Sequence, residues 1–218
     1  MRTEDLIADL ARRATPVRPL PSPGIRTLGW VGIAAGCVLA GLAIFGLRPG
    51  LDILIRQPEF VWTAVLALAT GVFAVVASLV LAIPGAERSP ALRATTVVIV
   101  GLWGMTLASA IVRAGHGLSG VSHWYICFIR VIAIGLGPAI ALVGMLRRAA
   151  PLRHGWTAAL AMAAPAAAGA FAIQFICPLG DAAHALFGHF APVVAAAVLG
   201  AAAAHSILAT RRPAASGR

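Results

Sequence analysis

Residues 60–84, FVWTAVLALATGVFAVVASLVLAIP, decide the fold of this chain. The stretch contains no charged side chain from Phe60 to Pro84. A helix needs about 20 predominantly apolar residues to cross the hydrocarbon core of a bilayer, and this stretch is long enough. The sequence therefore predicts a transmembrane helix here, and the same test applies to the rest of the chain.

Five other stretches meet this condition. Three carry no charge, whereas residues 124–146 contain Arg130 and residues 190–210 contain His205. Short segments rich in Gly, Pro and Ser separate the stretches and end each helix. We therefore predict an all-α polytopic membrane protein, a bundle of six transmembrane helices over residues 27–47, 60–84, 94–112, 124–146, 155–177 and 190–210. The expected divisions are an N-terminal segment, a transmembrane domain and a tail, over residues 1–26, 27–210 and 211–218.

The composition supports a membrane location. Hydrophobic residues make up 60% of the chain and charged residues 11%, whereas a soluble domain has about 45–50% and about 25%. Lipid must cover the excess of apolar surface. The net charge of +10 would suit a nucleic-acid-binding protein, but the arginines lie at the ends of apolar runs rather than in a soluble basic segment. We therefore expect the lipid bilayer as a partner and no direct contact with nucleic acid.

The distribution of arginine predicts the orientation. All seventeen basic residues are arginine, which we interpret as codon bias of a GC-rich bacterial genome. If the N-terminus is cytoplasmic, the outer loops hold only Arg48, Arg56 and Arg113. Cytoplasmic loops carry an excess of basic residues, so both termini are predicted to be cytoplasmic. The thirteen arginines on the predicted inner side are Arg2, Arg12, Arg13, Arg18, Arg26, Arg88, Arg93, Arg147, Arg148, Arg153, Arg211, Arg212 and Arg218.

Residues 3–14 are predicted to form a short cytoplasmic helix. Thr3 is expected to cap it, and acids in its first turn with Arg12 and Arg13 in its last turn suit the helix dipole. A helix of about 12 residues is marginal in water alone, so its apolar edge needs a surface to pack against. That surface is either a basic partner protein or the membrane and the inner loops, and both remain open. The candidate partner-binding residues are Glu4, Asp5, Leu6, Ile7, Asp9 and Leu10.

The predicted topology places two thiols, Cys127 and Cys177, at similar depth near the outer face. The bacterial periplasm exposes such thiols to oxidants and metal ions. Arg130 lies three residues after Cys127 on the same helix face, where its charge favours a thiolate that binds soft metals. An equally simple role for Arg130 is to anchor the helix at the membrane interface.

The outer loops and their borders carry four histidines, His116, His123, His184 and His189. Cysteine and histidine near one surface suit a zinc- or cadmium-type site, but the spacing is not diagnostic, and an interfacial hydrogen bond is the simpler role for any one histidine. His189 is kept as an auxiliary candidate, with Cys127 and Cys177 as the candidate metal ligands. Cys37, in the middle of the first span, is expected to pack. We expect no resident cofactor, only transient binding of a heavy metal.

Three short motifs suggest a family. The first is TEDLIADL followed by PVRPLP, over residues 3–21. The second is Cys127 followed by LRRAAPL at residues 146–152. The third is Cys177-Pro178 with GHFAP at residues 188–192. Together with the six-span layout, these motifs resemble the NrsF-like anti-sigma factors of proteobacteria over essentially the whole chain.

The resemblance implies a protein that holds an extracytoplasmic-function sigma factor at the inner membrane and keeps it inactive. It also implies that two periplasm-facing cysteines, here Cys127 and Cys177, sense heavy metals or oxidants. The family often has a more acidic run after Cys-Pro, whereas this chain has only Asp181 there. The identity of the inducer therefore does not follow from the resemblance.

The sequence hypothesis is a six-span anti-sigma factor that binds its sigma factor on the cytoplasmic side. Metal bridging or disulfide formation at the two thiols would release it. One alternative is a membrane thiol oxidoreductase, against which the lack of a C-x-x-C pair counts. Another is a small transporter subunit, against which the lack of intramembrane acids counts. No H-E-x-x-H, G-x-S-x-G or P-loop pattern is present, so we expect no catalytic residue and no enzyme.

Overall fold

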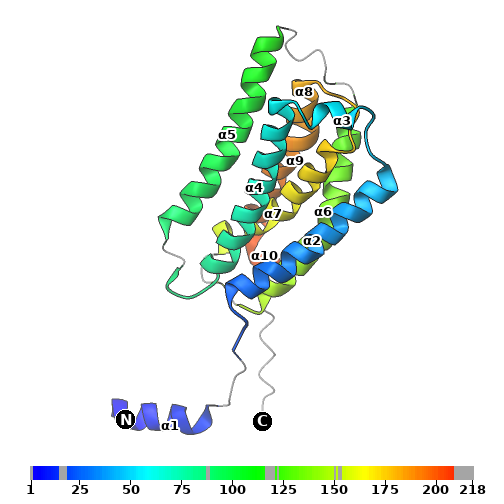
Figure 1. Cartoon of the computed structure of the whole chain (residues 1–218). Helices are drawn as coiled ribbons and strands as arrows, with labels where there is room; N and C mark the ends of the chain where they lie inside the picture. The colour runs from blue at the N-terminus through cyan, green and yellow to red at the C-terminus, as the bar shows by residue number, and fades with distance from the viewer. Residues whose placement is uncertain are drawn as a thin grey trace.

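The computed structural model describes residues 2–14, 19–86, 89–115, 121, 123–149, 151 and 154–208. These residues form helices and no strand, and six of the helices are long and apolar enough to cross a membrane (Figure 1). The prediction of an all-α polytopic protein with six such helices is confirmed. The helices are α1 Thr3–Arg13, α2 Pro23–Phe45, α3 Leu51–Leu54, α4 Pro58–Leu81, α5 Pro90–Ala114, α6 Trp124–Arg147, α7 His154–Gln174, α8 Ala182–Ala185, η2 Leu186–Phe190, α9 Ala191–Ala202 and α10 Ala204–Leu208.

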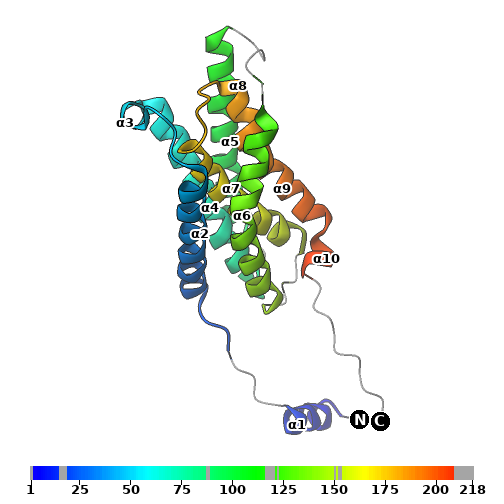
Figure 2. The ribbon, with the colours of Figure 1, turned by 90° about the vertical axis from the view of Figure 1, so that its right-hand side faces the viewer.

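Helix α7 forms the centre of the bundle, where it packs against α4, α6 and α9 (Figures 1 and 2). Glycine makes the closest approaches possible. A side chain at Gly169 would place its Cβ 2.1 Å from the carbonyl oxygen of Val131 on α6. A side chain at Gly200 on α9 would meet the carbonyl oxygen of Ala158 on α7 at 2.6 Å. Small residues at helix contacts are the usual means of close packing in a membrane, where no hydrophobic force drives helices together.

The two ends of the bundle differ in what they carry. Helix α2 begins and α10 ends at one end, which we call the terminal end (Figures 1 and 2). There the Arg147 Nε atom donates a 2.6 Å hydrogen bond to the carbonyl oxygen of Ile207. Helix α6 begins at the opposite end, beside α8 (Figure 1). We call that end, which holds Cys127 and Cys177, the thiol end.

The first spanning helix is tied to α6 by two buried donors. The Trp30 indole N–H donates to the carbonyl oxygen of Pro138, and the Arg26 guanidinium donates to the carbonyl oxygen of Met145. Both donor side chains are buried. Arginine in a membrane helix is rarely buried unless a partner accepts its hydrogen bonds, and the Met145 carbonyl oxygen is that partner here. The Ser22 hydroxyl accepts from the Ile25 N–H and caps the start of α2. Helix α2 is therefore held to α6 near the terminal end.

The sixth span begins earlier than residue 190. The long apolar helix of this region covers Ala182–Ala202, because the Asp181 carboxylate accepts from the N–H groups of Ala183 and His184 and starts a helix there. Pro192 has no N–H to give to the carbonyl four residues earlier, and the chain forms a π-turn over Leu186–Phe190 just before it. Helix α10 ends at Leu208. The end of the expected sixth span and the expected tail 211–218 lie outside the described residues.

Helix α1 lies apart from the bundle beyond the terminal end (Figures 1 and 2). Thr3 was expected to cap this helix, but it is the first helical residue, and the Asp5 carboxylate instead accepts from the Arg2 N–H at 3.3 Å. Asp5 stands in the first turn, so its carboxylate can reach back to that N–H. No residue of α1 is buried. The apolar edge formed by Leu6, Ile7 and Leu10 is thus left facing outward, with exposed fractions of 42%, 61% and 60%.

Candidate thiol and histidine site

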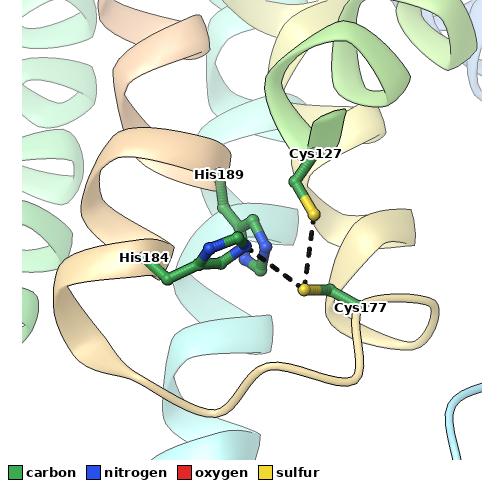
Figure 3. Close-up of side chains that lie close together, drawn as sticks. All are labelled: Cys127, Cys177, His184 and His189. Atoms are coloured by element: carbon green, nitrogen blue, oxygen red, sulfur yellow. Dashed lines mark hydrogen bonds between the residues drawn. The ribbon is translucent and has the colours of Figure 1, made fainter. Parts of the chain in front are cut away.

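Four buried side chains converge at the thiol end, Cys127, Cys177, His184 and His189 (Figure 3). Each has one sulfur or ring nitrogen that lies within 4.8 Å of the corresponding atoms of the other three. They come from different elements: α6, the segment after α7, α8 and η2. We call this group the Cys₂His₂ cluster. It contains the two thiols that the sequence singled out and the auxiliary histidine His189.

The two thiols touch each other. The Sγ atoms of Cys127 and Cys177 are 3.3 Å apart, and both thiols are free (Figure 3). Cys127 lies in the first turn of α6. The Cys177 N–H donates to the carbonyl oxygen of Ile173 at 2.8 Å, which carries the chain past the end of α7 before Pro178 turns it away. The helix ends therefore hold the sulfurs together without a covalent bond.

Cys177 is the more acidic thiol of the pair. The Cys127 thiol donates a hydrogen bond to its sulfur and lowers the Cys177 pKa well below its ordinary value, and the neighbouring His189 adds to this. Burial acts in the opposite direction, because a charged sulfur is poorly solvated there, but it does not outweigh the hydrogen bonds. These contacts favour the thiolate form of Cys177. A thiolate is the form that binds metals and attacks oxidants.

The two histidines complete the cluster. His184 Nε2 lies 3.4 Å from Cys177 Sγ, and the two imidazole rings stand nearly perpendicular with centroids 5.5 Å apart. Both rings are buried. Neither ring nitrogen of His189 has a hydrogen-bond partner of good geometry within the described structure, although the ring lies near Cys177. Leaving a buried polar nitrogen unsatisfied costs about 1–3 kcal/mol, so such an atom calls for a functional explanation.

The π-turn explains how His184 and His189 meet. On a regular α-helix, residues five apart lie about 140° apart around the axis and cannot share a site. A π-turn has i to i+5 hydrogen bonds and brings such residues one above the other. Gly188 then allows η2 to approach α6, since a Cβ there would lie 3.2 Å from both the Cys127 Cβ and the Trp124 carbonyl oxygen. Local backbone geometry therefore builds half of the cluster.

None of the other candidate residues that the structure describes is a member of the cluster, although Arg130 lies close enough to Cys127 for its charge to act on that thiol. The Arg130 guanidinium stacks over the ring of Phe45, 4.9 Å from its centroid. His123 is exposed and its ring faces Tyr125. Cys37 packs against α6, where a Cβ on Gly137 would lie 2.8 Å from its sulfur. His116 lies outside the described residues. The candidate partner-binding residues are all on α1, at the opposite end of the molecule (Figure 1): Glu4, Asp5, Leu6, Ile7, Asp9 and Leu10.

Sequence reasoning missed His184 as a member of the site. It treated the four outer histidines separately because their spacing in the sequence fits no metal motif. A usable signal was present in the order of residues: Asp181 caps a helix, and Pro192 disturbs the following turns. Those two features enclose His184 and His189 and favour the irregular helix that joins them.

Comparison of the chain with known protein families identifies the family to which it belongs. The family described as NrsF, negative regulator of sigma F, matches residues 10–209. The chain belongs to the NrsF family. Both Cys127 and Cys177 and both histidines of the cluster fall within the matched range, whereas most of α1 precedes it. No curated protein and no solved structure matches the chain.

Membership of the NrsF family establishes the general role. A NrsF protein is a negative regulator of a sigma factor, so a sigma factor is the partner of this chain. The resemblance inferred from the sequence motifs is confirmed. Regulation rather than catalysis is the role of the family, which agrees with the expectation that the chain is not an enzyme. The six long apolar helices make it a multi-pass membrane protein.

Proposed function

We propose that this NrsF protein holds an extracytoplasmic-function sigma factor at the bacterial inner membrane and releases it when Cys127 and Cys177 meet a heavy metal or an oxidant. The terminal end would face the cytoplasm and the thiol end the periplasm. The observation that carries the proposal is the placement of the reactive thiols and the chain's exposed N-terminal helix at opposite ends of one bundle (Figure 1).

The exposed edge of α1 supports a role in sigma-factor binding. Leu6, Ile7 and Leu10 form one apolar stripe, and burying such side chains contributes about 1.5–3 kcal/mol each. Glu4 and Asp5 flank the stripe and would meet a basic surface on the partner. The helix has a clear amphipathic pattern, but none of its residues is buried in the part of the chain that the structure describes, so its apolar edge is free to bind another protein.

Helix α6 provides a route for the signal. It carries Cys127 at the thiol end, and its carbonyl groups at Pro138 and Met145 accept hydrogen bonds from Trp30 and Arg26 on α2. In sequence, α2 follows α1. A shift of α6 that breaks or remakes these bonds would move the base of α2 and, with it, the segment that holds the sigma factor. Such control requires two alternative helix packings and a coupling free energy of about 1–3 kcal/mol.

The thiol oxidoreductase alternative gains no support from the arrangement of the cysteines. Passing electrons from a substrate to quinone through thiols usually requires a second cysteine pair. The one remaining cysteine, Cys37, lies in α2 against Gly137 and has no thiol partner. We therefore propose regulation alone.

The proposal is tested by capture of the sigma factor. The full chain with an affinity tag is expressed together with each candidate sigma factor, solubilised in mild detergent and purified with its partner before and after exposure of the cells to cadmium. Capture before stress and loss after it are expected. The pair of substitutions Cys127→Ser and Cys177→Ser should keep capture and prevent loss, whereas Cys37→Ser should behave like the natural chain. Failure to capture any sigma factor would overturn the proposal.

A further inference from the structure

We propose that Cys127, Cys177, His184 and His189 bind one divalent cation of the zinc and cadmium class in a tetrahedral S₂N₂ site. This ion would be the signal that the proposed sensor detects, and its role in regulation rests on the proposed function. Metal binding itself can be measured without a sigma factor. Because two histidines are also ligands, this site differs from a pair of cysteines that binds a metal or forms a disulfide without them.

The distances fit such an ion. Bonds of about 2.3 Å to sulfur and about 2.0–2.1 Å to nitrogen place two sulfurs of a tetrahedral zinc site roughly 3.8 Å apart and a sulfur and a nitrogen roughly 3.6 Å apart. The Sγ atoms of Cys127 and Cys177 are 3.3 Å apart and would separate slightly around an ion, and His184 Nε2 is 3.4 Å from Cys177 Sγ. The nearest His189 nitrogen lies within 4.8 Å of all of these atoms. Only small side-chain movements separate this arrangement from a complete coordination shell.

The charges also fit. Two thiolates and two neutral imidazoles around a divalent cation form a group with no net charge, which suits a buried position better than an isolated ion. All four side chains are buried. Sulfur and imidazole donors together select zinc, cadmium and similar soft or borderline ions over magnesium or calcium, which prefer oxygen.

His189 supplies an independent indication of a ligand. Both of its ring nitrogens are buried without a hydrogen-bond partner of good geometry within the described residues. A disulfide between Cys127 and Cys177 would leave these nitrogens as they are. A metal ion would satisfy one of them and would fix the orientation of the ring. The metal therefore accounts for all four residues, whereas oxidation accounts for two.

A cavity at the thiol end gives an ion access to the site. It has a volume of about 150 Å³ and lies between α4, α5 and α8, with His189 in its wall. Its polar lining includes two arginines, Arg48 and Arg113, and two acids, Glu59 and Asp181. The Arg113 guanidinium forms an ion pair with the Glu59 carboxylate at 3.6 Å. The carboxylate offsets part of the positive charge that would otherwise repel an entering cation. The ion would enter this cavity and reach His189 first.

The experiment uses the purified full chain in detergent with its thiols reduced. Cobalt(II) is added as a spectroscopic probe, because its visible absorption distinguishes tetrahedral from octahedral coordination and shows thiolate ligands. One cobalt per chain in a tetrahedral thiolate-containing site is expected, displaced by one equivalent of zinc or cadmium. A stoichiometry other than one, or an octahedral spectrum, would overturn the proposal.

Variants test the histidines. His184→Ala and His189→Ala should each lower cadmium affinity by at least tenfold and abolish the tetrahedral cobalt spectrum, whereas His123→Ala, a histidine exposed at the same end, should change neither. His189→Cys keeps a metal-binding side chain and should retain cadmium binding, which guards against loss through misfolding. Unchanged cadmium affinity in both His→Ala variants would mean a two-thiol site and would overturn the inference.

The two proposals fail separately. If cadmium binds as expected but the sigma factor is never captured, the metal site stands and the proposed function is wrong. If the sigma factor is captured and released by an oxidant while no variant or natural chain binds cobalt, zinc or cadmium, the proposed function stands and the metal site is wrong.

Discussion

Trp30 on α2 donates its indole N–H to the carbonyl oxygen of Pro138 on α6, 108 positions later in the chain, with 2.9 Å between nitrogen and oxygen. The Trp30 side chain is only 2% exposed, so water cannot replace the bond readily. Pro138 also interrupts the hydrogen bonds within α6, because it has no N–H. The bond thus joins α2 to α6 at a point where α6 is able to bend.

Removing this bond should uncouple the two ends of the molecule. Trp30→Phe keeps an aromatic ring but loses the donor, which removes about 1 kcal/mol, a large part of an ordinary coupling free energy. We expect normal cadmium binding and reduced release of the sigma factor at saturating cadmium. Both are measured on the purified chain. Trp62→Phe is the control, because Trp62 on α4 is half exposed. Release equal to that of the natural chain would show that the signal does not pass through Trp30.

The apolar edge of α1 should be required for binding. Leu6→Asp with Leu10→Asp removes two side chains worth about 1.5–3 kcal/mol each when buried, so affinity for the sigma factor should fall roughly a hundredfold or more. Membrane insertion should be unaffected, since α1 lies outside the bundle. Affinity is measured by titration of purified sigma factor. Leu20→Asp, at another exposed leucine of the N-terminal segment, is the control. Full binding by the double variant would assign the sigma-factor surface to the inner loops instead.

The Cys177 thiol should titrate at unusually low pH. Its pKa is lowered first by the hydrogen bond from Cys127, so its thiolate should persist well below the ordinary thiol value of about 8.5. Because its pKa is lowered by folding, Cys177 releases its proton more readily in the folded chain than in the unfolded chain. The thiolate therefore stabilises the fold above the unfolded pKa, and this contribution is lost as pH falls through the folded pKa.

Ultraviolet absorbance of thiolates measures this in a Cys37→Ser background. One thiolate per chain is expected at neutral pH, and Cys127→Ala should raise the midpoint because it removes the donor. A midpoint near 8.5 in the Cys37→Ser chain would contradict the assignment of Cys177 as the thiolate.

The contact between α6 and α7 should not tolerate a methyl group. Gly169→Ala would place Cβ 2.1 Å from the backbone oxygen of Val131, which cannot move without shifting α6. We expect destabilisation of about 1–3 kcal/mol, measured as a lower thermal unfolding midpoint in detergent. Gly155→Ala is the matched control on α7, because nothing lies within 4 Å of the added Cβ. Equal midpoints for the two variants would contradict the close packing.

The sequence was sufficient to predict the membrane helices because each is a long apolar run, and such runs have few other stable conformations. Helix ends were harder. The start of the sixth span depends on one hydrogen-bonding carboxylate, Asp181, which lies nine positions before the predicted start at Phe190. Similarly, Thr3 and Asp5 both suit the start of α1, and the choice between them depends on backbone geometry.

The candidate site was predictable only in part. The span assignment placed Cys127 and Cys177 near the same end, and the structure brings their sulfurs into contact. The sequence analysis did not predict that His184 and His189 join them, because regular helix geometry places residues five apart on different faces. The π-turn before Pro192 changes that geometry. Arg130 shares a helix face with Cys127, but its guanidinium stacks on Phe45 from α2, a long-range contact that spacing does not reveal.

The most direct test of the account is a cadmium titration of the purified complex between the full chain and its sigma factor. Release of the sigma factor should be complete at one cadmium per chain in the natural protein and in Cys37→Ser. It should be absent in Cys177→Ser, although this variant still binds the sigma factor. Release that proceeds equally well without Cys177, or a complex that survives saturating cadmium and oxidant alike, would contradict control of sigma-factor binding by the Cys₂His₂ cluster.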